Sequence, residues 1–427
     1  MKSVLCVGLG KLGLTFGQII AKYYQVYGYD KNIQIYNQIK KNIKQSEPQL
    51  NSLIASNEDN FKIAENLHKG VLSTQCAFLV LPTPSQKNHE FDNRYILSCL
   101  NDMGKILKYK KKYHIVITST VNPGSCMKFI KYLENKFDIK HGVHFILSYN
   151  PHLIALGSIY ENIMNNDLVI VGSDLKEGHI FLKNFYKKIY KKKIDKLNFL
   201  KLKEGEIAKI SINAYVTMKI SFSNMISQIS DTEKNIDVSK ILNTIGSDTR
   251  IGKKYLSLGA LFAGPCFPRD NLSLIQFLKK SKTNYSLPRA TDNVNSIQLN
   301  RYIKLFNSLK KNIKQKIVIG ICGLSYKSNT NINTKSPGIL LFNKFKNKYD
   351  TITFDLLKPD NNQELNFTDD LNTFFEKSNI IFICYKDDKF KKLERMKSNK
   401  KKVIIDLWNF LNIKQKNIII NKVGLSD

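Results

Sequence analysis

The chain has 427 residues, which is enough for two or three domains that each bury a sizeable core. Hydrophobic residues make up 42% of the chain and aromatic residues 11%, which excludes disorder along its whole length. The 67 lysines and arginines exceed the 35 acidic residues and give a net charge of +32, but the lysines form short dispersed clusters, so we expect a solvated basic surface and no nucleic-acid partner.

The seven cysteines are scattered, without the spacing of a disulfide framework or a zinc site. We therefore expect no metal and a reducing, cytoplasmic environment. The apolar run at the N-terminus is too short for a signal peptide, and no other run reaches the length of a membrane span. The sequence thus predicts a protein without a membrane partner.

The N-terminal 30 residues have the pattern of a dinucleotide-binding unit. A short apolar strand (residues 2–7) runs into a glycine-rich turn, which is followed by an amphipathic helix (14–24) and a second strand (26–29). The glycines would admit a pyrophosphate to the helix N-terminus, and an acid after the second strand would bind ribose hydroxyls and favour NAD over NADP. The predicted NAD contacts are Gly8, Gly10, Leu12, Gly13 and Asp30.

Three further apolar segments, expected as strands, run into loops with prolines or hydroxyl side chains. The carboxyl ends of parallel strands form the ligand-binding edge of an open sheet. We therefore expect Thr83 to contact the cofactor and Thr120 to lie at the rim of an active site, while turn chemistry alone remains an alternative for each loop. The third loop, residues 149–152, ends in His152.

Residues 204–230 form the longest helical pattern in the chain. Lys209 and Asn213 are four residues apart and so share one face. A lysine on a helix is usually solvated, but isoleucines flank this one, so a partly buried functional ammonium is also plausible. Such a helix could join two domains or pair with its copy in a dimer.

Residues 259–270 (GALFAGPCFPRD) place a cysteine after small residues and a proline. Small residues allow backbone to approach a ligand closely. Arg269 and Asp270 bring a cation and a carboxylate near Cys266, and the cation would favour a thiolate. The alternative is that Cys266 is a buried structural cysteine. The motifs elsewhere in the chain argue against this alternative.

The remainder of the chain alternates helix and strand. Residues 289–298 are expected to be helical, with Asn295 and Gln298 on a polar face. Four apolar strands follow from residue 316 onward. The sequence predicts an α/β protein with two Rossmann-like doubly wound domains joined by a long central helix. The predicted divisions are an NAD-binding domain (1–198), a central helical region with the cysteine (199–300), and a C-terminal Rossmann-like domain (301–427).

The motifs together resemble those of the UDP-glucose/GDP-mannose dehydrogenase family over nearly the whole chain. They occur in the family's order: GLGKLG (8–13), LPTP (81–84), STVNPG (119–124), SYNP (148–151), EIAKISIN (206–213), DTRIG (248–252), GPCFPRD (264–270) and GLSYKSNT (323–330). The resemblance implies oxidation of the primary alcohol of a nucleotide-linked hexose to a carboxylate with two NAD. It also implies a central dimerising helix and a C-terminal domain that holds the nucleotide.

The resemblance implies a role for each matching residue. Cys266 would be the nucleophile that forms a thiohemiacetal and then a thioester. Lys209 and Asn213 would stabilise the oxyanion, and Asp270 with Thr120 would hold and activate water. Further contacts implied for cofactor or substrate are Thr120 and Arg269 near NAD, Gly264 and Lys327 near the sugar nucleotide, and Arg250 supplied by a neighbouring subunit.

The chain departs from the family pattern at several positions. His152 stands where the family has a glutamate, a proposed proton shuttle, so we consider a substituted shuttle and a loop histidine without a role. Thr334 stands in the place of a family arginine, and Arg269 in that of a lysine. The remaining departures are Asn331 and Ile332 in place of acids, and Leu261 and Ala263 in place of glycines.

The predicted function is NAD-dependent oxidation of UDP-glucose to UDP-glucuronate for surface polysaccharide such as a capsule, by a homodimer or larger homo-oligomer. Another UDP-hexose, a UDP-N-acetylhexosamine or GDP-mannose is an alternative substrate. A homologue that binds a nucleotide sugar without turnover is a second alternative, motivated by His152 and Thr334. A nucleic-acid-binding protein is a third, which rests on charge alone.

Overall fold

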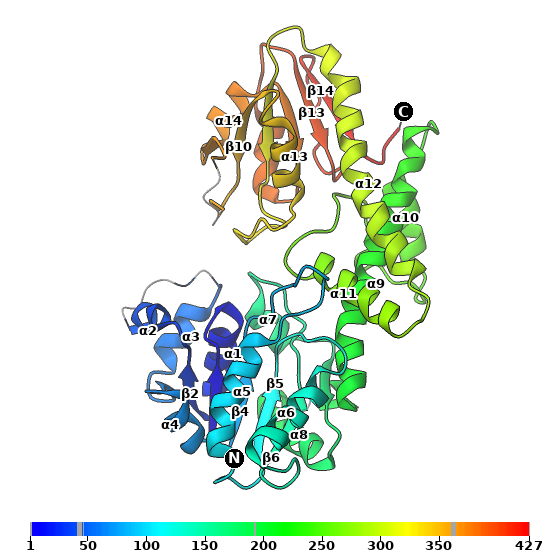
Figure 1. Cartoon of the computed structure of the whole chain (residues 1–427). Coiled ribbons are helices and arrows are strands. Elements are labelled where there is room, and N and C mark those ends of the chain that lie inside the picture. Colours follow the sequence, from blue (N-terminus) through cyan, green and yellow to red (C-terminus); the bar gives the residue numbers. More distant parts are fainter. Residues whose placement is uncertain (1, 41–44, 46, 192–193, 360–363, 427) are drawn as a thin grey trace. The chain divides into compact units, whose positions relative to one another are not determined.

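The computed structural model describes residues 2–40, 45, 47–191, 194–359 and 364–426 (Figure 1). The chain divides into two compact units, Met1–Ser211 and Ile212–Asp427, which are described separately. The long helix α9 (Leu202–Ser227) crosses this division. The predicted domain divisions fall within β8 (Leu197–Leu200) and within α12 (Ser286–Leu309), and the three-part organisation stays a prediction.

The first unit holds a doubly wound sheet of eight strands in the order β3-β2-β1-β4-β5-β6-β7-β8. All neighbouring strands are parallel except β6 and β7. Its strands are β1 (Ser3–Val7), β2 (Gln25–Tyr29), β3 (Phe61–Ile63), β4 (Cys76–Leu79), β5 (Tyr113–Ile117), β6 (Phe145–Tyr149), β7 (Val169–Gly172) and β8. The chain leaves β1 toward β2 and later returns to place β4 on the other side of β1, which creates the switch point where such sheets bind ligands.

Helices cover both faces of this sheet, which explains why its central strands are apolar on both sides. One face packs against α1 (Lys11–Ala21), α3 (Leu50–Ser56), α7 (Ile159–Met164) and α8 (Lys176–Tyr190). The other face packs against α4 (Leu67–Leu72), α5 (Arg94–Leu107) and α6 (Ser125–Phe137). The short helix α2 (Ile33–Lys40) follows β2.

The second unit begins with helices and ends with a parallel sheet of six strands in the order β11-β10-β9-β12-β13-β14. Its strands are β9 (Val318–Cys322), β10 (Asp350–Phe354), β11 (Phe367–Thr368), β12 (Ile380–Ile383), β13 (Lys402–Asp406) and β14 (Ile418–Lys422). One face of the sheet packs against α12 and α13 (Pro337–Phe345), and the other against α14 (Leu371–Lys377) and the 3-10 segment Asp388–Arg395.

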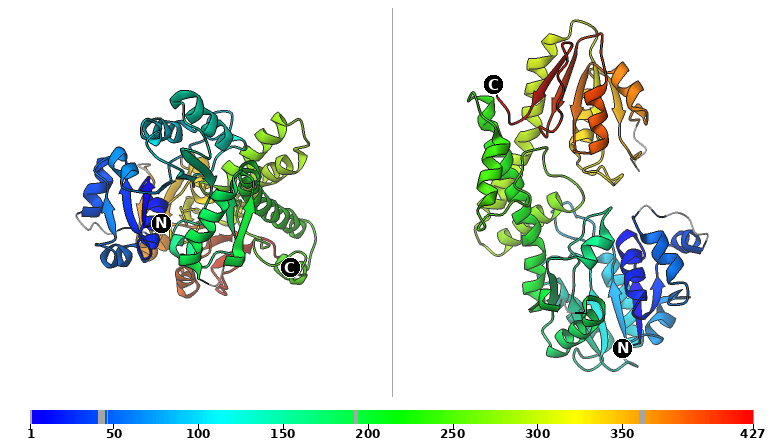
Figure 2. Two further views of the ribbon diagram at one scale, coloured as in Figure 1. Left: turned by 90° about the horizontal axis from the view of Figure 1, so that it is seen from below. Right: turned by 180° about the vertical axis from the view of Figure 1, so that it is seen from behind.

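The helices of the second unit before its sheet are the C-terminal half of α9, α10 (Val238–Ser247), α11 (Phe267–Lys280) and α12. Helices α9 and α12 lie side by side (Figure 2), and the Ser221 hydroxyl of α9 donates to the Thr291 carbonyl of α12 at 2.8 Å. The predicted fold class, α/β with two Rossmann-like doubly wound sheets and a long central helix, is confirmed. None of the helices in the described ranges is long and apolar enough to cross a membrane.

Candidate active site

The glycine-rich turn of the first unit has the form of a pyrophosphate site. A Cβ added at Gly13 would lie 1.8 Å from the Gly8 carbonyl oxygen, so only glycine lets α1 pack this closely on the turn after β1. A Cβ added at Gly10 would meet nothing within 4 Å, so space is open in front of the turn. The N-cap residue of α1 is Gly10, which makes no side-chain cap hydrogen bond, and the N-terminal end of a helix is a favourable place for a phosphate.

Asp30 follows β2 and is fixed beside this turn. Its carboxylate accepts hydrogen bonds from the Leu9 amide at 2.7 Å and from the Asn32 amide at 2.8 Å. A carboxylate held here suits ribose hydroxyls and repels a 2′-phosphate, as the sequence predicted for an NAD site. Leu12 is partly buried and packs against the hydrophobic core on the α1 face of the sheet.

The structure joins the two threonine loops that were predicted separately. The Thr83 hydroxyl donates to the Thr120 carbonyl at 2.8 Å. The Ser119 hydroxyl donates to the Leu81 carbonyl at 2.7 Å and accepts from the Leu81 amide at 2.8 Å. Because the loops follow neighbouring strands β4 and β5, these bonds hold Thr83 and Thr120 together at the carboxyl edge of the sheet.

Glu206 of α9 fastens the end of the Thr120 loop. Its carboxylate is fully buried and accepts hydrogen bonds from the Gly124 amide and, at 2.7 Å, from the Cys126 amide, where α6 begins. Burial raises the pKa of this carboxyl, while the two amide donors favour its anion. Lys209 lies one turn further along α9 and is 4% exposed, so it is a buried lysine rather than a solvated one.

His152 packs its ring against Phe16 of α1, with 4.6 Å between the ring centroids. Burial lowers the pKa of His152 to about 4, so the imidazole is neutral at pH 7. Its Nε2 atom is buried and has no hydrogen-bond partner among the described residues. A neutral histidine can accept a proton, but the role of His152 as a shuttle stays a prediction.

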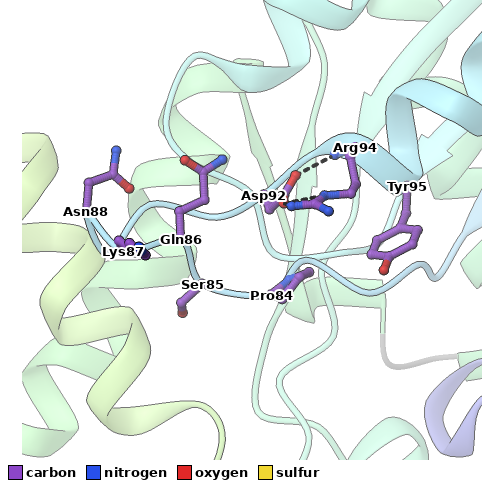
Figure 3. Close-up of a pocket in the computed structure, with 8 residues that line it drawn as sticks. All are labelled: Pro84, Ser85, Gln86, Lys87, Asn88, Asp92, Arg94 and Tyr95. Carbon is purple, nitrogen blue, oxygen red and sulfur yellow. Dashed lines mark hydrogen bonds and ion pairs between the residues drawn. The ribbon is translucent and has the colours of Figure 1, made fainter.

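A hollow of about 760 Å³ lies beside the Thr83 loop (Figure 3). It extends from the loop after β4 to the first turn of α5, and the Arg94 guanidinium on its wall pairs with the Asp92 carboxylate. Its lining residues are Pro84, Ser85, Gln86, Lys87, Asn88, Asp92, Arg94 and Tyr95. The hollow is therefore lined mostly by residues with polar or charged side chains, and it lies next to the predicted cofactor contact.

In the second unit, Cys266 differs from every other cysteine of the chain. It is partly exposed, whereas the remaining six are buried. It occupies the N-cap position of α11, and Pro268 lies in the first turn of that helix. The N-terminal end of a helix favours an anion, so this sulfur is both accessible and placed where a thiolate is stabilised.

Asp270 lies one helical turn after Cys266 and is fully buried. Its Oδ2 atom accepts a hydrogen bond from the Asn213 amide at 2.6 Å, and its Oδ1 atom lies 3.5 Å from the Arg269 Nε atom. The structure therefore brings Asn213, Arg269 and Asp270 together next to the cysteine. Asn213 is four residues from Lys209 on α9, as predicted.

The backbone at Gly264 links the cysteine segment to the loop after β9. Gly264 has a φ of +84°, which favours glycine, and its amide donates to the Thr334 carbonyl at 2.9 Å. A Cβ added there would lie 2.7 Å from the Tyr326 ring. The Lys327 ammonium lies 5.8 Å from the centroid of the same ring. Gly264 and Lys327, both predicted substrate contacts, thus both lie near the Tyr326 ring.

Arg250 is not part of this cluster. Its side chain is 87% exposed and pairs with the Asp248 carboxylate at 2.6 Å. Lys219 of α9 donates to the carbonyls of Ile251 at 3.1 Å and Gly252 at 3.0 Å, which anchors the loop that carries Arg250. An exposed arginine on an anchored loop is available to a neighbouring molecule.

Sequence reasoning gave no role to Glu206 or Asp248, although both lie in quoted motifs. The available signals were that Glu206 precedes Lys209 by one helical turn, and that Asp248 precedes Arg250 by two residues. No group of three or more His, Cys, Asp or Glu side chains that could hold a metal ion occurs in the part of the chain that the structure describes.

Three family models match the chain. They are the NAD-binding domain (residues 2–194), the central domain (203–297) and the UDP-binding domain (320–413) of the UDP-glucose/GDP-mannose dehydrogenase family. Among curated relatives, UDP-glucose 6-dehydrogenase of Rickettsia typhi is 27% identical over 437 residues, covering 99% of this chain and 98% of its own. UDP-glucose 6-dehydrogenase TuaD of Bacillus subtilis is 24% identical, covering 97% and 91%.

Solved structures show the same fold. A UDP-glucose dehydrogenase from Pyrobaculum islandicum matches with a TM-score of 0.87 at 22% identity, covering 100% of this chain and 98% of that one. A UDP-D-ManNAc dehydrogenase from Pyrococcus horikoshii matches with a TM-score of 0.85 at 20% identity, covering 99% of both chains. With its dinucleotide cradle and all three domain models matched, the chain belongs to the UDP-glucose/GDP-mannose dehydrogenase family and is an NAD-dependent oxidoreductase.

Proposed function

We propose that this chain oxidises UDP-glucose to UDP-glucuronate in two NAD-dependent steps through a covalent intermediate on Cys266. The observation that carries the proposal is the accessible cysteine at the start of α11, one turn from a buried Asp270 that Asn213 holds. The names of the curated relatives support UDP-glucose as the substrate, and the match to the UDP-binding domain model supports a UDP-sugar.

When bound, NAD accepts one hydride in each of the two oxidations. In the first oxidation, C6 of the sugar loses a hydride and its hydroxyl loses a proton, which leaves an aldehyde. The Cys266 sulfur then adds to the aldehyde carbon, and the carbonyl oxygen takes up a proton to give a thiohemiacetal. Loss of a second hydride and a proton converts this adduct to a thioester, so four electrons leave the substrate in total.

Hydrolysis of the thioester requires a stabilised oxyanion and a held water. Lys209 and Asn213 can both donate to the oxyanion, and one such donor contributes about 2.7–4 kcal/mol. Asp270 and Thr120 are proposed to hold the attacking water and accept its proton. Water then adds to the carbonyl carbon, the Cys266 thiolate leaves, and the sugar departs as a carboxylate. His152 is proposed to act as the proton acceptor that replaces the family glutamate.

We propose that different residues of the chain bind different parts of the NAD molecule. Gly8, Gly10 and Gly13 would receive the pyrophosphate, and Asp30 would bind the adenosine ribose. Thr83 and Thr120 lie together at the sheet edge and are proposed, with Arg269 and Leu12, as the remaining contacts. For the sugar nucleotide, the proposed contacts are Lys209, Asn213, Gly264, Lys327 and the partner-supplied Arg250.

We infer that the active form is a homodimer or a larger homo-oligomer. On α9, Tyr215, Phe222 and Met225 are exposed apolar residues that share one helical face. Lys219 lies on the same face and holds the Arg250 loop beside it. A second copy that covers this face would bury the apolar side chains and receive an exposed arginine, which supports delivery of Arg250 to a neighbouring site.

The proposed setting is the cytoplasm, where the product would serve surface polysaccharide synthesis such as a capsule. All seven cysteines are free in the structure, which fits a reducing compartment. The proposed parts of the chain are the NAD-binding domain (1–198), the central dimerising region (199–300) and the nucleotide-sugar domain (301–427).

The deciding test is the number of NADH molecules formed per sugar consumed, with purified protein, NAD and a panel of UDP- and GDP-sugars. We expect two NADH per UDP-glucose, and a stall before carboxylate release in Cys266→Ser, because a serine cannot form the thioester. Turnover of a UDP-N-acetylhexosamine or of GDP-mannose in place of UDP-glucose would contradict the proposed substrate but would be consistent with the proposed mechanism. No NADH from any sugar, with NAD still bound, would reduce the protein to a binding homologue.

A further inference from the structure

Asn295 of α12 makes a two-point contact with the backbone shortly before the cysteine. Its side-chain Oδ1 atom accepts a hydrogen bond from the Phe262 amide at 2.7 Å, and its Nδ2 atom donates to the Phe262 carbonyl at 3.1 Å. One amide side chain thus bonds both polar groups of a single residue, as a neighbouring β-strand would. Phe262 lies four residues before Cys266 and is itself buried.

Two more side chains hold the same stretch of backbone. The Asn224 amide of α9 donates to the Ala260 carbonyl at 3.3 Å, and the Tyr302 hydroxyl of α12 donates to the Gly259 carbonyl at 2.9 Å. Residues 258–264 are buried without being part of a helix or strand, so several of their backbone groups take side chains as partners. Within the second unit, α9 and α12 therefore form the support on which the cysteine segment lies.

We propose that Asn295 is a positioning residue that sets the place of Cys266 through the backbone of residues 259–264. The inference deepens the proposed function and rests on it for the role of Cys266. Both of these Asn295 hydrogen bonds go to Phe262, so the proposed effect on Cys266 passes through the backbone of the segment. We call the paired hydrogen bonds between Asn295 and Phe262 the clamp. A displacement of about 1 Å at a reacting atom can lower the rate about 100-fold, so loss of the clamp would affect the reaction at the Cys266 sulfur.

Aspartate at position 295 tests the clamp with little change in volume. A carboxylate still accepts from the Phe262 amide but cannot donate to the Phe262 carbonyl, so one of the two bonds becomes a repulsion. Asn379 provides a matched control in the same unit. Its amide donates to the Lys316 carbonyl at 2.8 Å and accepts from the Val318 amide at 3.0 Å, between β9 and β12.

The experiment compares Asn295→Asp with Asn379→Asp in the full chain. Three quantities are measured: the midpoint of thermal unfolding, the rate at which iodoacetamide alkylates the protein at one pH, and kcat and KM for the sugar nucleotide and for NAD. Cys266 is the only cysteine that is not buried, and Cys266→Ser identifies its share of the alkylation. All the proposed NAD contacts except Arg269 lie in the first unit, so a change in the KM for NAD reports mainly non-specific damage.

For Asn295→Asp we expect alkylation several-fold faster than in the parent, because the loosened segment exposes the sulfur. We also expect a fall of about 10- to 100-fold in kcat/KM for the sugar nucleotide, with KM for NAD unchanged. Asn379→Asp should lose a similar amount of thermal stability but keep the alkylation rate and the kcat/KM for the sugar nucleotide of the parent protein. If Asn295→Asp does not fold, Asn295→Ala removes both bonds without adding a charge and is read in the same way.

Equal losses in the two variants, in proportion to their thermal stability, would overturn the proposal. So would a parent-like alkylation rate in Asn295→Asp. The alkylation readout needs no turnover. Failure of the proposed substrate, with no NADH formed by the parent protein, is therefore distinguishable from failure of the clamp.

Discussion

At the scale of single residues, buried polar groups of the candidate site are each held by a partner distant in sequence. Glu206 receives two backbone amides at the start of α6, and Asp270 receives the Asn213 amide. Burying a carboxylate without donors is costly, so these hydrogen bonds offset part of the cost of burying the two acids. His152 has the opposite environment, because an aromatic ring and burial keep it neutral.

The partly buried His152, whose Nε2 atom is inaccessible to solvent, predicts a pH dependence of stability. In the unfolded chain a histidine binds a proton below about pH 6.5, whereas folded His152 binds one only near pH 4. The unfolded state therefore gains protons first, and the free energy of unfolding should fall as the pH drops from 6.5 toward 4. His152→Asn should lower this slope by up to about 1.4 kcal/mol per pH unit.

Urea unfolding of the parent protein and of His152→Asn at pH 5 and pH 7 measures this difference. His114 is partly buried and also has its pKa lowered to about 4, so the parent slope contains both histidines and the variant keeps the His114 part. Parallel pH dependences in the parent and the variant would contradict the burial of His152.

At the scale of elements, side chains from one element complete the ends of another. Lys402 begins β13 and is buried, and its ammonium donates to the Phe375 carbonyl at 2.6 Å and to the Ser378 carbonyl at 2.5 Å, where α14 ends. The last carbonyls of a helix have no partner within the helix. A lysine inside the sheet thus both satisfies α14 and fixes it to β13.

Replacing Lys402 with methionine should destabilise the second unit. The change keeps the apolar stem but leaves buried carbonyls without a donor, which costs about 1–3 kcal/mol for each unsatisfied group. Lys401 is exposed and adjacent, so Lys401→Met is the matched control and should change stability by less than about 0.5 kcal/mol. The free energy of unfolding in urea is measured for both, and equal effects would show that charge rather than capping is responsible.

The exposed apolar face of α9 predicts how the oligomer responds to a buried charge. Phe222→Lys places an ammonium in the middle of the face formed with Tyr215 and Met225. If a second copy covers this face, the charge is desolvated and the dimer dissociates. Light scattering after size-exclusion chromatography should show a monomer for this variant and a dimer for Lys203→Glu, which alters an exposed position elsewhere on α9. A dimeric Phe222→Lys would place the interface on another surface.

At the scale of the whole molecule, the sheets of the two units share a topology. Each has an aspartate after its second strand, but the two aspartates have different surroundings. Asp30 follows β2 and Asp355 follows β10, each after the second strand of its sheet. The Asp355 carboxylate is 2% exposed and accepts from the Leu324 and Ser325 amides and from the Tyr385 hydroxyl. The Asp355 carboxylate therefore uses its hydrogen-bond acceptors within the protein. Asp30, by contrast, is partly exposed beside an open glycine turn.

We therefore expect one NAD per chain, bound by the first unit. Isothermal titration calorimetry should give a stoichiometry of one for the parent and no binding for Asp30→Ala, because the ribose hydroxyls lose their acceptor. NAD at about 100 times its dissociation constant should stabilise the parent by about 2.7 kcal/mol and leave Asp30→Ala unchanged. Two NAD per chain would mean that the second sheet also binds the dinucleotide.

Local patterns made the cofactor half of the molecule predictable. The NAD site is built from elements that are contiguous in the sequence: a strand, the glycine turn, a helix, a second strand and Asp30. Their spacing alone therefore predicts how they are arranged. The long helix expected at 204–230 is α9, which ends three residues earlier. Between residues 31 and 70 the structure contains β3, a short edge strand that the sequence did not predict. That strand forms because it pairs with β2, and no local periodicity reveals such a partner.

The sequence by itself determined the family, the cofactor, the candidate cysteine and the alternation of strands and helices, because each depends on residues close together in the chain. Only the tertiary structure decided that Glu206 holds the Thr120 loop, that Asn213 bonds Asp270, and that Asn295 clamps Phe262. The physical reason is that hydrogen-bond partners for buried polar groups are chosen by proximity in space. Folding brings these partners together across 33 to 82 residues of sequence.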